Sequence, residues 1–167
     1  VRSRGLGDVY KRQYLHNASP VHMWHSLFQQ NGMLRQLSEE SKHLFFSQLL
    51  MDDKKNISTE KSLIVCGSGN NGGDGFAVAR LLTEQGKHAD VLFAGKEASL
   101  SEECRCQKQI VENMGISVFT EFPDEEYTVI IDAVFGVGLC REITEHYKDV
   151  IDWMNLQDAE KVAVDIP

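Results

Sequence analysis

The sequence has little positive charge, no long apolar run and no cysteine framework. Its 17 Lys and Arg residues are outnumbered by 25 Asp and Glu, so the formal net charge of -8 argues against nucleic acid or an anionic membrane surface as a partner. No apolar run approaches the roughly 18 residues of a membrane span, and no signal-peptide core follows the basic N-terminus. The cysteines are scattered, at Cys66, Cys104, Cys106 and Cys140. This spacing is typical of a reducing compartment, so we expect a cytoplasmic protein.

The length of 167 residues fits one domain of ordinary size. Residues 1–13 carry four basic side chains and no apolar pattern, and they resemble vector-derived or read-through sequence, so we exclude them from the fold argument. We treat residues 14–167 as one domain. Because the sequence stops at Pro167, directly after a predicted strand, we expect the natural protein to continue beyond this residue.

Predicted strands and helices alternate from residue 62 onward. Short apolar runs predict strands, and apolar residues at helical spacing predict helices between them. The predicted strands are Ser62–Cys66, Ala89–Ala94, Ile116–Phe119, Thr128–Ile131 and Val162–Ile166, and the predicted helices are Phe76–Gln85, Ser101–Met114 and Thr144–Leu156. An earlier amphipathic segment, Leu34–Met51, predicts a helix that covers one face of the sheet. This alternation predicts an α/β fold, a three-layer Rossmann-like domain with a mostly parallel, doubly wound sheet.

A glycine-rich stretch, residues 67–75, connects the first predicted strand of this series to the helix that follows. Its five glycines allow tight turns and allow a ligand to approach main-chain N–H groups, although an ordinary connection uses the same residue types. Ligands of doubly wound sheets bind outside the carboxyl ends of the strands. Two other predicted strands are also followed by polar or glycine-rich residues, at Asp132–Leu139 and at Asp165. We therefore predict that the three strand ends form one crevice.

The stretch satisfies the G-x-G-x-x-G pattern of dinucleotide-dependent dehydrogenases, but two features disfavour that chemistry. An acidic residue is expected about 20 positions later, where this chain has 94–96, Ala-Gly-Lys. Asp74, at the predicted helix start, would repel a pyrophosphate. A Walker-type phosphate loop is excluded because no Gly-Lys-Ser/Thr follows. The neutral oxygens of Asn70 and Asn71, with a carboxylate at Asp132, suit a weakly held hard cation, while a turn or cap role for Asp132 stays open.

These residues resemble the motifs of a known family. Residues 69–76, followed by Ala79-Arg80 and Gly86, are similar to the signature of the NAD(P)H-hydrate epimerase family, also called the YjeF N-terminal domain. Residues 131–139 and 164–167 resemble its second and third motifs. The similarity runs from about residue 62 to 167. The N-terminal third departs from the family, because only Leu49–Asp53 stands where a Leu-Met-Glu-Asn-Ala-Gly-like stretch is expected.

The resemblance implies a Rossmann-like isomerase that interconverts the R and S forms of hydrated NADH and NADPH. This metabolite repair step feeds a dehydratase, fused or separate, and the resemblance leaves the preference between the two hydrates open. It implies a homodimer and a potassium ion held by Asn71 and Asp132. It also implies that the substrate is bound by Asn70, Asn71, Gly72, Gly73, Asp74, Gly136, Val137, Gly138, Leu139, Cys140, Arg141, Glu142 and Asp165.

Epimerisation requires one group to protonate the departing hydroxyl and another to activate water on the opposite face of the ring. We hypothesise that Asp132 and Asp165 serve in these steps. The alternative is a non-catalytic dimerising scaffold, because the fold is also similar to the dimerising domain of a eukaryotic RNA-decapping scaffold. The intact residues 70–74 and Asp132 favour the enzyme.

Overall fold

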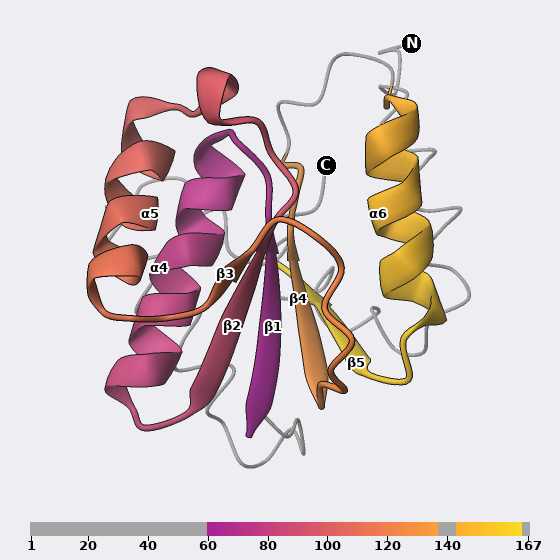
Figure 1. Cartoon of the computed structure of the whole chain (residues 1–167), viewed down its shortest axis with the longest axis horizontal. Coiled ribbons are helices and arrows are strands. Elements are labelled where there is room, and N and C mark those ends of the chain that lie inside the picture. The colour runs from indigo at the N-terminus through magenta and orange to yellow at the C-terminus, as the bar shows by residue number, and fades with distance from the viewer. Residues whose placement is uncertain (1–59, 137–142, 165–167) are drawn as a thin grey trace, which may run out of the picture.

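The computed structural model describes residues 60–136 and 143–164, and in this part strands and helices alternate except between the third and fourth strands, which no helix separates (Figure 1). The predicted helix at Leu34–Met51, the segment 1–13, residues 137–142 and Asp165 lie outside the described residues. The elements in chain order are β1 (Lys61–Cys66), α4 (Asn70–Glu84), β2 (His88–Phe93), the 3-10 turn η3 (Glu97–Ser99), α5 (Glu102–Asn113), β3 (Val118–Phe119), β4 (Val129–Ala133), α6 (Glu145–Leu156) and β5 (Glu160–Ala163).

The five strands form one sheet in the order β3-β2-β1-β4-β5, and every neighbouring pair is parallel. From β1 the chain proceeds outward to β2 and β3, and it then returns to the other side of β1 for β4 and β5 (Figure 1). The predicted α/β class with a doubly wound parallel sheet is therefore confirmed. The reversal falls between β1 and β4, which is the topological switch point where ligands of such sheets bind.

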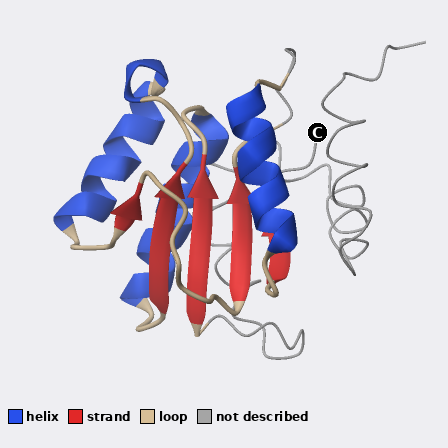
Figure 2. Cartoon of the chain, turned by 45° about the vertical axis from the view of Figure 1, so that its right-hand side comes forward, coloured by secondary structure: helices blue, strands red, loops and turns tan. Residues whose placement is uncertain are grey.

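Helices α4 and α5 cover one face of the sheet, and α6 covers the other (Figure 2). Ile64 and Cys66 of β1 belong to the core under α4 and α5, whereas Leu63 and Val65 belong to the core under α6. All four side chains are fully buried. The apolar run of β1 is continuous because the strand is covered on both faces. None of the helices in the described ranges is long and apolar enough to cross a bilayer.

Helix α4 begins at Asn70, not at Phe76 as predicted. Gly69 precedes it with extended backbone and no side-chain cap, and the glycines of the predicted loop form its first turns. They are needed for close packing: a Cβ atom on Gly72 would lie 2.0 Å from the carbonyl oxygen of Gly67, and one on Gly75 would lie 2.5 Å from the Cβ of Ala133. Asparagine and glycine have low helix propensity, so the sequence predicted a loop, but tertiary packing decides otherwise.

Both predicted helix ends are confirmed. Gly86 and Gly115 each have a φ of 76°, the left-handed conformation that ends a helix without steric cost to glycine. The hydroxyl of Ser101 accepts a hydrogen bond from the N–H of Cys104 at 3.2 Å, which caps α5 as predicted.

The bounds of all five strands differ somewhat from the prediction, and the differences in β4 and β5 bear on the site. β4 extends through Ala133, so Asp132 lies inside the strand, whereas the predicted strand ended at Ile131. β5 spans Glu160–Ala163 instead of Val162–Ile166. The cause is the pairing register, in which Glu160 opposes Val129 and Ala163 opposes Asp132. Pairing with β4 decides where β5 begins, and hydrophobicity alone does not reveal it.

Candidate functional site

The carboxyl ends of β1 and β4 touch at the switch point. Val65 pairs with Asp132, and the N–H of Gly67 donates to the carbonyl oxygen of Ala133 at 3.1 Å. A Cβ atom on Gly67 would lie 2.2 Å from the carbonyl oxygen of Val134, so only glycine allows this approach. The loop after β5 is adjacent too, because the N–H of Val164 donates to the carbonyl oxygen of Asp132 at 2.9 Å. Val164, the last described residue, therefore lies beside Asp132.

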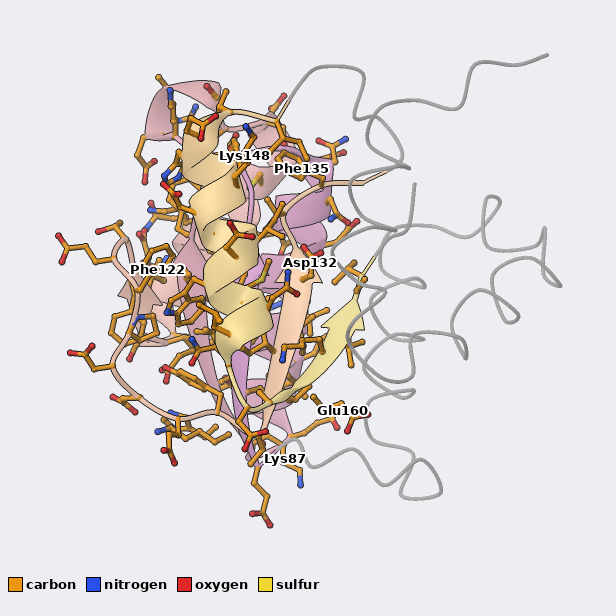
Figure 3. The ribbon with its side chains drawn as sticks, turned by 90° about the vertical axis from the view of Figure 1, so that its right-hand side faces the viewer. Lys87, Phe122, Asp132, Phe135, Lys148 and Glu160 are labelled. Atoms are coloured by element: carbon orange, nitrogen blue, oxygen red, sulfur yellow. The ribbon has the colours of Figure 1, made fainter. Side chains whose placement is uncertain are left out.

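Asp132 lies near the carboxyl end of β4 with only 9% of its surface exposed (Figure 3). Its Oδ1 atom accepts a hydrogen bond from the N–H of Val134 at 2.9 Å. This bond to the residue two positions later is the local turn contact typical of aspartate, so the turn role that the sequence left open is present. The bond also fixes the carboxylate in one orientation at the switch point.

Asn71 is the second residue of α4, and both polar atoms of its side-chain amide are buried. Neither atom has a hydrogen-bond partner among the described residues. A buried polar group without a partner costs about 1–3 kcal/mol, so this amide needs a ligand to satisfy it. An unpaired amide oxygen in the helix that follows β1 and a buried carboxylate near the end of the adjacent strand β4 fit a weakly bound potassium ion. The ion would satisfy the amide oxygen, and the amide nitrogen would still require an acceptor from substrate or water.

The remaining predicted substrate residues lie in different surroundings. Asn70 is exposed, whereas Gly72 and Gly73 are buried against the β1–α4 connection and α5. Asp74 is half-buried and lies inside α4, beyond its first turn, which contains no acidic residue. The argument that Asp74 repels a pyrophosphate at the helix start is therefore wrong. Gly136 is half-buried after β4, and the predicted contacts of residues 137–142 and Asp165 lie outside the described residues.

The first turn of α6 joins two strand ends beside the site, which sequence reasoning missed. His146 Nε2 lies 2.9 Å from the carbonyl oxygen of Ala94, directly after β2. The ring of Tyr147 packs edge-on against Phe135 after β4, with centroids 4.7 Å apart. The sequence shows an aromatic residue, Phe135, directly after the predicted strand. Its contact with Tyr147 could not be predicted, because it depends on how α6 packs onto the sheet.

Two thiols lie close to the switch point, and neither is a nucleophile at neutral pH. Burial, with smaller effects from Cys104 and Asp132, raises the pKa of Cys66 well above its ordinary value. Burial likewise raises the pKa of Cys104 to about 11. Cys106 is exposed on the other side of α5, so the close pair Cys104 and Cys106 does not point to one metal. Within the described ranges, no three His, Cys, Asp or Glu side chains cluster around a point.

The fold and the site together define a doubly wound α/β domain with buried polar side chains at its switch point. The sequence profile of a family described as "YjeF-related protein N-terminus" matches residues 32–167. The chain belongs to this family.

Relatives and one solved structure agree with this membership. The chain is 40% identical over 116 residues to a protein of Oenococcus oeni named NAD(P)H-hydrate epimerase, which covers 69% of this chain and 55% of the relative. It is 36% identical over 132 residues to a Levilactobacillus brevis protein of the same name, and this alignment covers 78% of this chain and 60% of the relative. The chain thus spans about half the length of the curated relatives it matches. A crystal structure of yeast ynu0, YNL200c, has a TM-score of 0.62 at 20% identity, covers 98% of this chain and 70% of that one, and supports the fold.

Proposed function

We propose that the protein is an NAD(P)H-hydrate epimerase, which interconverts the R and S forms of hydrated NADH and NADPH. The observation that carries the proposal is the unpaired buried amide of Asn71 in the first turn of α4, which follows β1, together with the buried Asp132 near the end of the neighbouring strand β4. Both residues lie in motifs that resemble those of the family, at the positions that the resemblance assigns to its potassium ligands. The names of the relatives support the same activity.

The reaction needs a polar, oriented site but no redox partner. Loss of hydroxide from the hydrated ring carbon, driven by the adjacent nitrogen, gives a planar cation that water can attack from either face. The departing hydroxyl takes a proton, and the attacking water loses one. Asp132 holds one oxygen toward Val134, which leaves its other oxygen to order water. We assign the second proton-transfer role to Asp165, the next residue in the sequence after Val164, whose N–H donates to the carbonyl oxygen of Asp132.

The direct test is R/S exchange of hydrated NADH by the purified protein in potassium buffer, followed by chromatography of the two forms. Asp132→Ala and Asp165→Ala are each expected to slow exchange at least about tenfold, because each removes a group that orders or transfers a proton. Thermal melting of the variants separates lost chemistry from lost folding. Wild-type-like exchange would remove that residue from the mechanism, and no exchange by the wild type would favour the scaffold.

We also propose that Asn71 and Asp132 hold a potassium ion that orders the strand ends. An ion bound only by the native state stabilises it, so potassium at roughly ten times its Kd should raise the Tm by about 3–6 °C above that in sodium. Asn71→Ala should abolish this difference. Asn70→Ala, which removes the exposed neighbouring amide, should retain it. Equal Tm values of the wild type in the two salts would contradict the potassium site.

We further propose a cytoplasmic homodimer that passes the S form to a dehydratase, fused or separate. The free thiols Cys66, Cys104 and Cys106 support a reducing compartment. Light scattering over a range of protein concentrations tests the dimer, and a monomer mass at every concentration would contradict it.

A further inference from the structure

We propose that Lys96 binds the 2′-phosphate of NADPH-hydrate, so that this chain prefers NADPH-hydrate to NADH-hydrate. The inference rests on the proposed function and concerns the substrate preference of the same site. It depends on where Lys96 lies, how firmly its backbone is held and which charges surround it.

Lys96 follows the carboxyl end of β2, the strand next to β1, so it lies at the same end of the sheet as the site. Cys66 pairs with Phe93 at the ends of the two strands, and the N–H of Ala94 donates to the carbonyl oxygen of Cys66 at 2.9 Å. Gly95 then packs closely against the β1–α4 connection, because a Cβ atom on Gly95 would lie 2.7 Å from the backbone nitrogen of Ser68. Lys96 is therefore the first side chain beyond this contact.

The backbone around Lys96 is held on both sides. The carbonyl oxygen of Lys96 accepts a hydrogen bond from the N–H of Ser99 at 2.9 Å, and this bond closes η3. Glu97 forms an ion pair with Lys108 of α5, with 2.9 Å between Oε1 and Nζ. The N–H of Ser101 donates to the carbonyl oxygen of Ser68 at 2.9 Å. A cation on an anchored segment loses less backbone freedom when it binds a ligand than one on a loose loop.

The charge of Lys96 is available for an anion. Four other cations of the described part are paired with carboxylates, whereas Lys87, Arg105 and Lys161 form no ion pair there; the paired ones are Lys61, Arg80, Lys108 and Lys148. Lys96 is exposed and forms no ion pair within the described ranges, and the adjacent carboxylate of Glu97 is already engaged by Lys108. A dianionic phosphate is therefore the kind of ligand that this position attracts.

The chemistry of dinucleotide sites explains why the position matters. In doubly wound sheets, side chains at and near the end of the second strand bind the adenosine ribose: an acidic side chain accepts a hydrogen bond from a free 2′-hydroxyl, and a cation nearby accommodates a 2′-phosphate. The first turn of α4 has no side-chain cap and no acidic residue, so its N–H groups can face a diphosphate. With the diphosphate at α4, the ribose extends over the end of β2, where the chain has Lys96 in place of an acid.

The experiment measures kcat/KM for both hydrates in the wild type and in Lys96→Glu. Charge reversal should lower the ratio of kcat/KM for NADPH-hydrate to that for NADH-hydrate by about fivefold or more, and added salt should lower the wild-type ratio too. The matched control is Lys87→Glu, since Lys87 lies at the end of the molecule opposite Phe135 (Figure 3). It makes the same change in net charge and should leave the ratio within about twofold of the wild type, because the site is far away.

A second measurement separates this inference from the proposed function. Binding of adenosine 2′,5′-bisphosphate, compared with adenosine 5′-monophosphate, is followed by calorimetry in the same variants. Selective weakening of the bisphosphate in Lys96→Glu supports the inference even if the protein catalyses no exchange. An unchanged ratio of hydrates, or equal weakening of both nucleotides, would overturn it and leave the epimerase proposal standing.

Discussion

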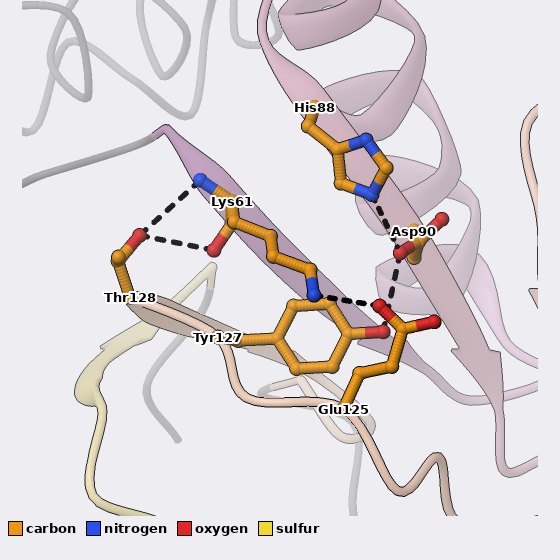
Figure 4. Close-up of polar contacts among 6 residues, drawn as sticks. All are labelled: Lys61, His88, Asp90, Glu125, Tyr127 and Thr128. Carbon is orange, nitrogen blue, oxygen red and sulfur yellow. Dashed lines mark hydrogen bonds and ion pairs between the residues drawn. The ribbon is translucent and has the colours of Figure 1, made fainter.

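A buried carboxylate, Asp90 of β2, contacts polar side chains toward the end of the sheet opposite the site (Figure 4). Its Oδ2 atom accepts a hydrogen bond from the hydroxyl of Tyr127 at 3.1 Å and lies 2.9 Å from Nε2 of His88. Lys61 pairs with Glu125 at 2.6 Å and lies over the Tyr127 ring. Burial, followed by the charge of Asp90, raises the pKa of Tyr127. Tyr127 therefore remains a protonated donor well into the alkaline range.

Replacing Tyr127 with phenylalanine should lower stability in a pH-dependent way. At neutral pH, Tyr127→Phe leaves Asp90 with one partner fewer and should reduce the free energy of unfolding by about 1–2 kcal/mol. The raised pKa means that Tyr127 stabilises the fold fully below its unfolded pKa of about 10 and loses that contribution as the pH rises further. The gap between wild type and variant should therefore narrow above about pH 10. Urea denaturation from pH 7 to 11 measures it.

The matched control is Tyr147→Phe, which removes a half-buried hydroxyl with no hydrogen-bond partner in the described part. Its stability should follow the wild type across the same pH range. A gap for Tyr127→Phe that stays constant or widens with pH would contradict the assigned role of Tyr127.

At the scale of elements, the sequence predicted most of the strands and the helix ends. β1 and β4 are buried on both faces, so their apolar runs stand out, and glycines end α4 and α5. The sequence misplaced the start of α4 because glycine and asparagine have low helix propensity. The close contact of Gly72 and Gly75 with the sheet ends decides the helix start, and it is visible only once β1 and β4 are paired.

This close packing predicts that Gly75→Ala destabilises the protein. Alanine gains about 1 kcal/mol in helix propensity over glycine, but the new Cβ would lie 2.5 Å from the Cβ of Ala133 and 2.7 Å from the Sγ of Cys66. Overpacking against a sheet costs about 1–3 kcal/mol, and such short contacts belong at the upper end, so a net loss of at least about 1 kcal/mol is expected in urea denaturation.

Gly69→Ala is the control for Gly75→Ala, because a Cβ on Gly69 meets nothing within 4 Å. It should change the free energy of unfolding by less than about 1 kcal/mol, as expected for an N-cap that already lacks a side chain. Equal losses in the two variants would mean that helix entry, and not contact with the sheet, makes these glycines necessary.

At the scale of the whole molecule, the sequence correctly predicted that the loop after β1 and Asp132 lie at the same end of the sheet, but it did not predict the contacts within this region. Order along the chain and the rule for parallel sheets sufficed to bring the loop after β1 next to Asp132. Two features of the site depend on how α4 and α6 pack on opposite faces of the sheet. They are the unpaired amide of Asn71 and the contact of His146 with the carbonyl oxygen of Ala94. No periodicity encodes them. The contacts of Asp165 and residues 137–142 stay predictions.

The two buried thiols report whether the described part unfolds as one unit. Cys66 lies in the central strand and Cys104 in α5, and both combine burial with a raised pKa, whereas Cys106 is exposed. In a Cys140→Ser background, a thiol reagent at pH 8 should therefore label Cys106 at once and the buried pair only through opening. Mass spectrometry follows each site over time.

The labelling rates of Cys66 and Cys104 should agree with each other and with the free energy of global unfolding from urea. α5 packs on α4 through Gly73, where a Cβ would already lie 3.2 Å from the Cα of Cys104, and the Cys104 thiol donates to the carbonyl oxygen of Gly67 at 3.6 Å. Detaching α5 would expose α4 and the strand ends together. Much faster labelling of Cys104 than of Cys66 would show instead that α5 opens alone, and that the β1–α4 connection loses one of its supports without global unfolding.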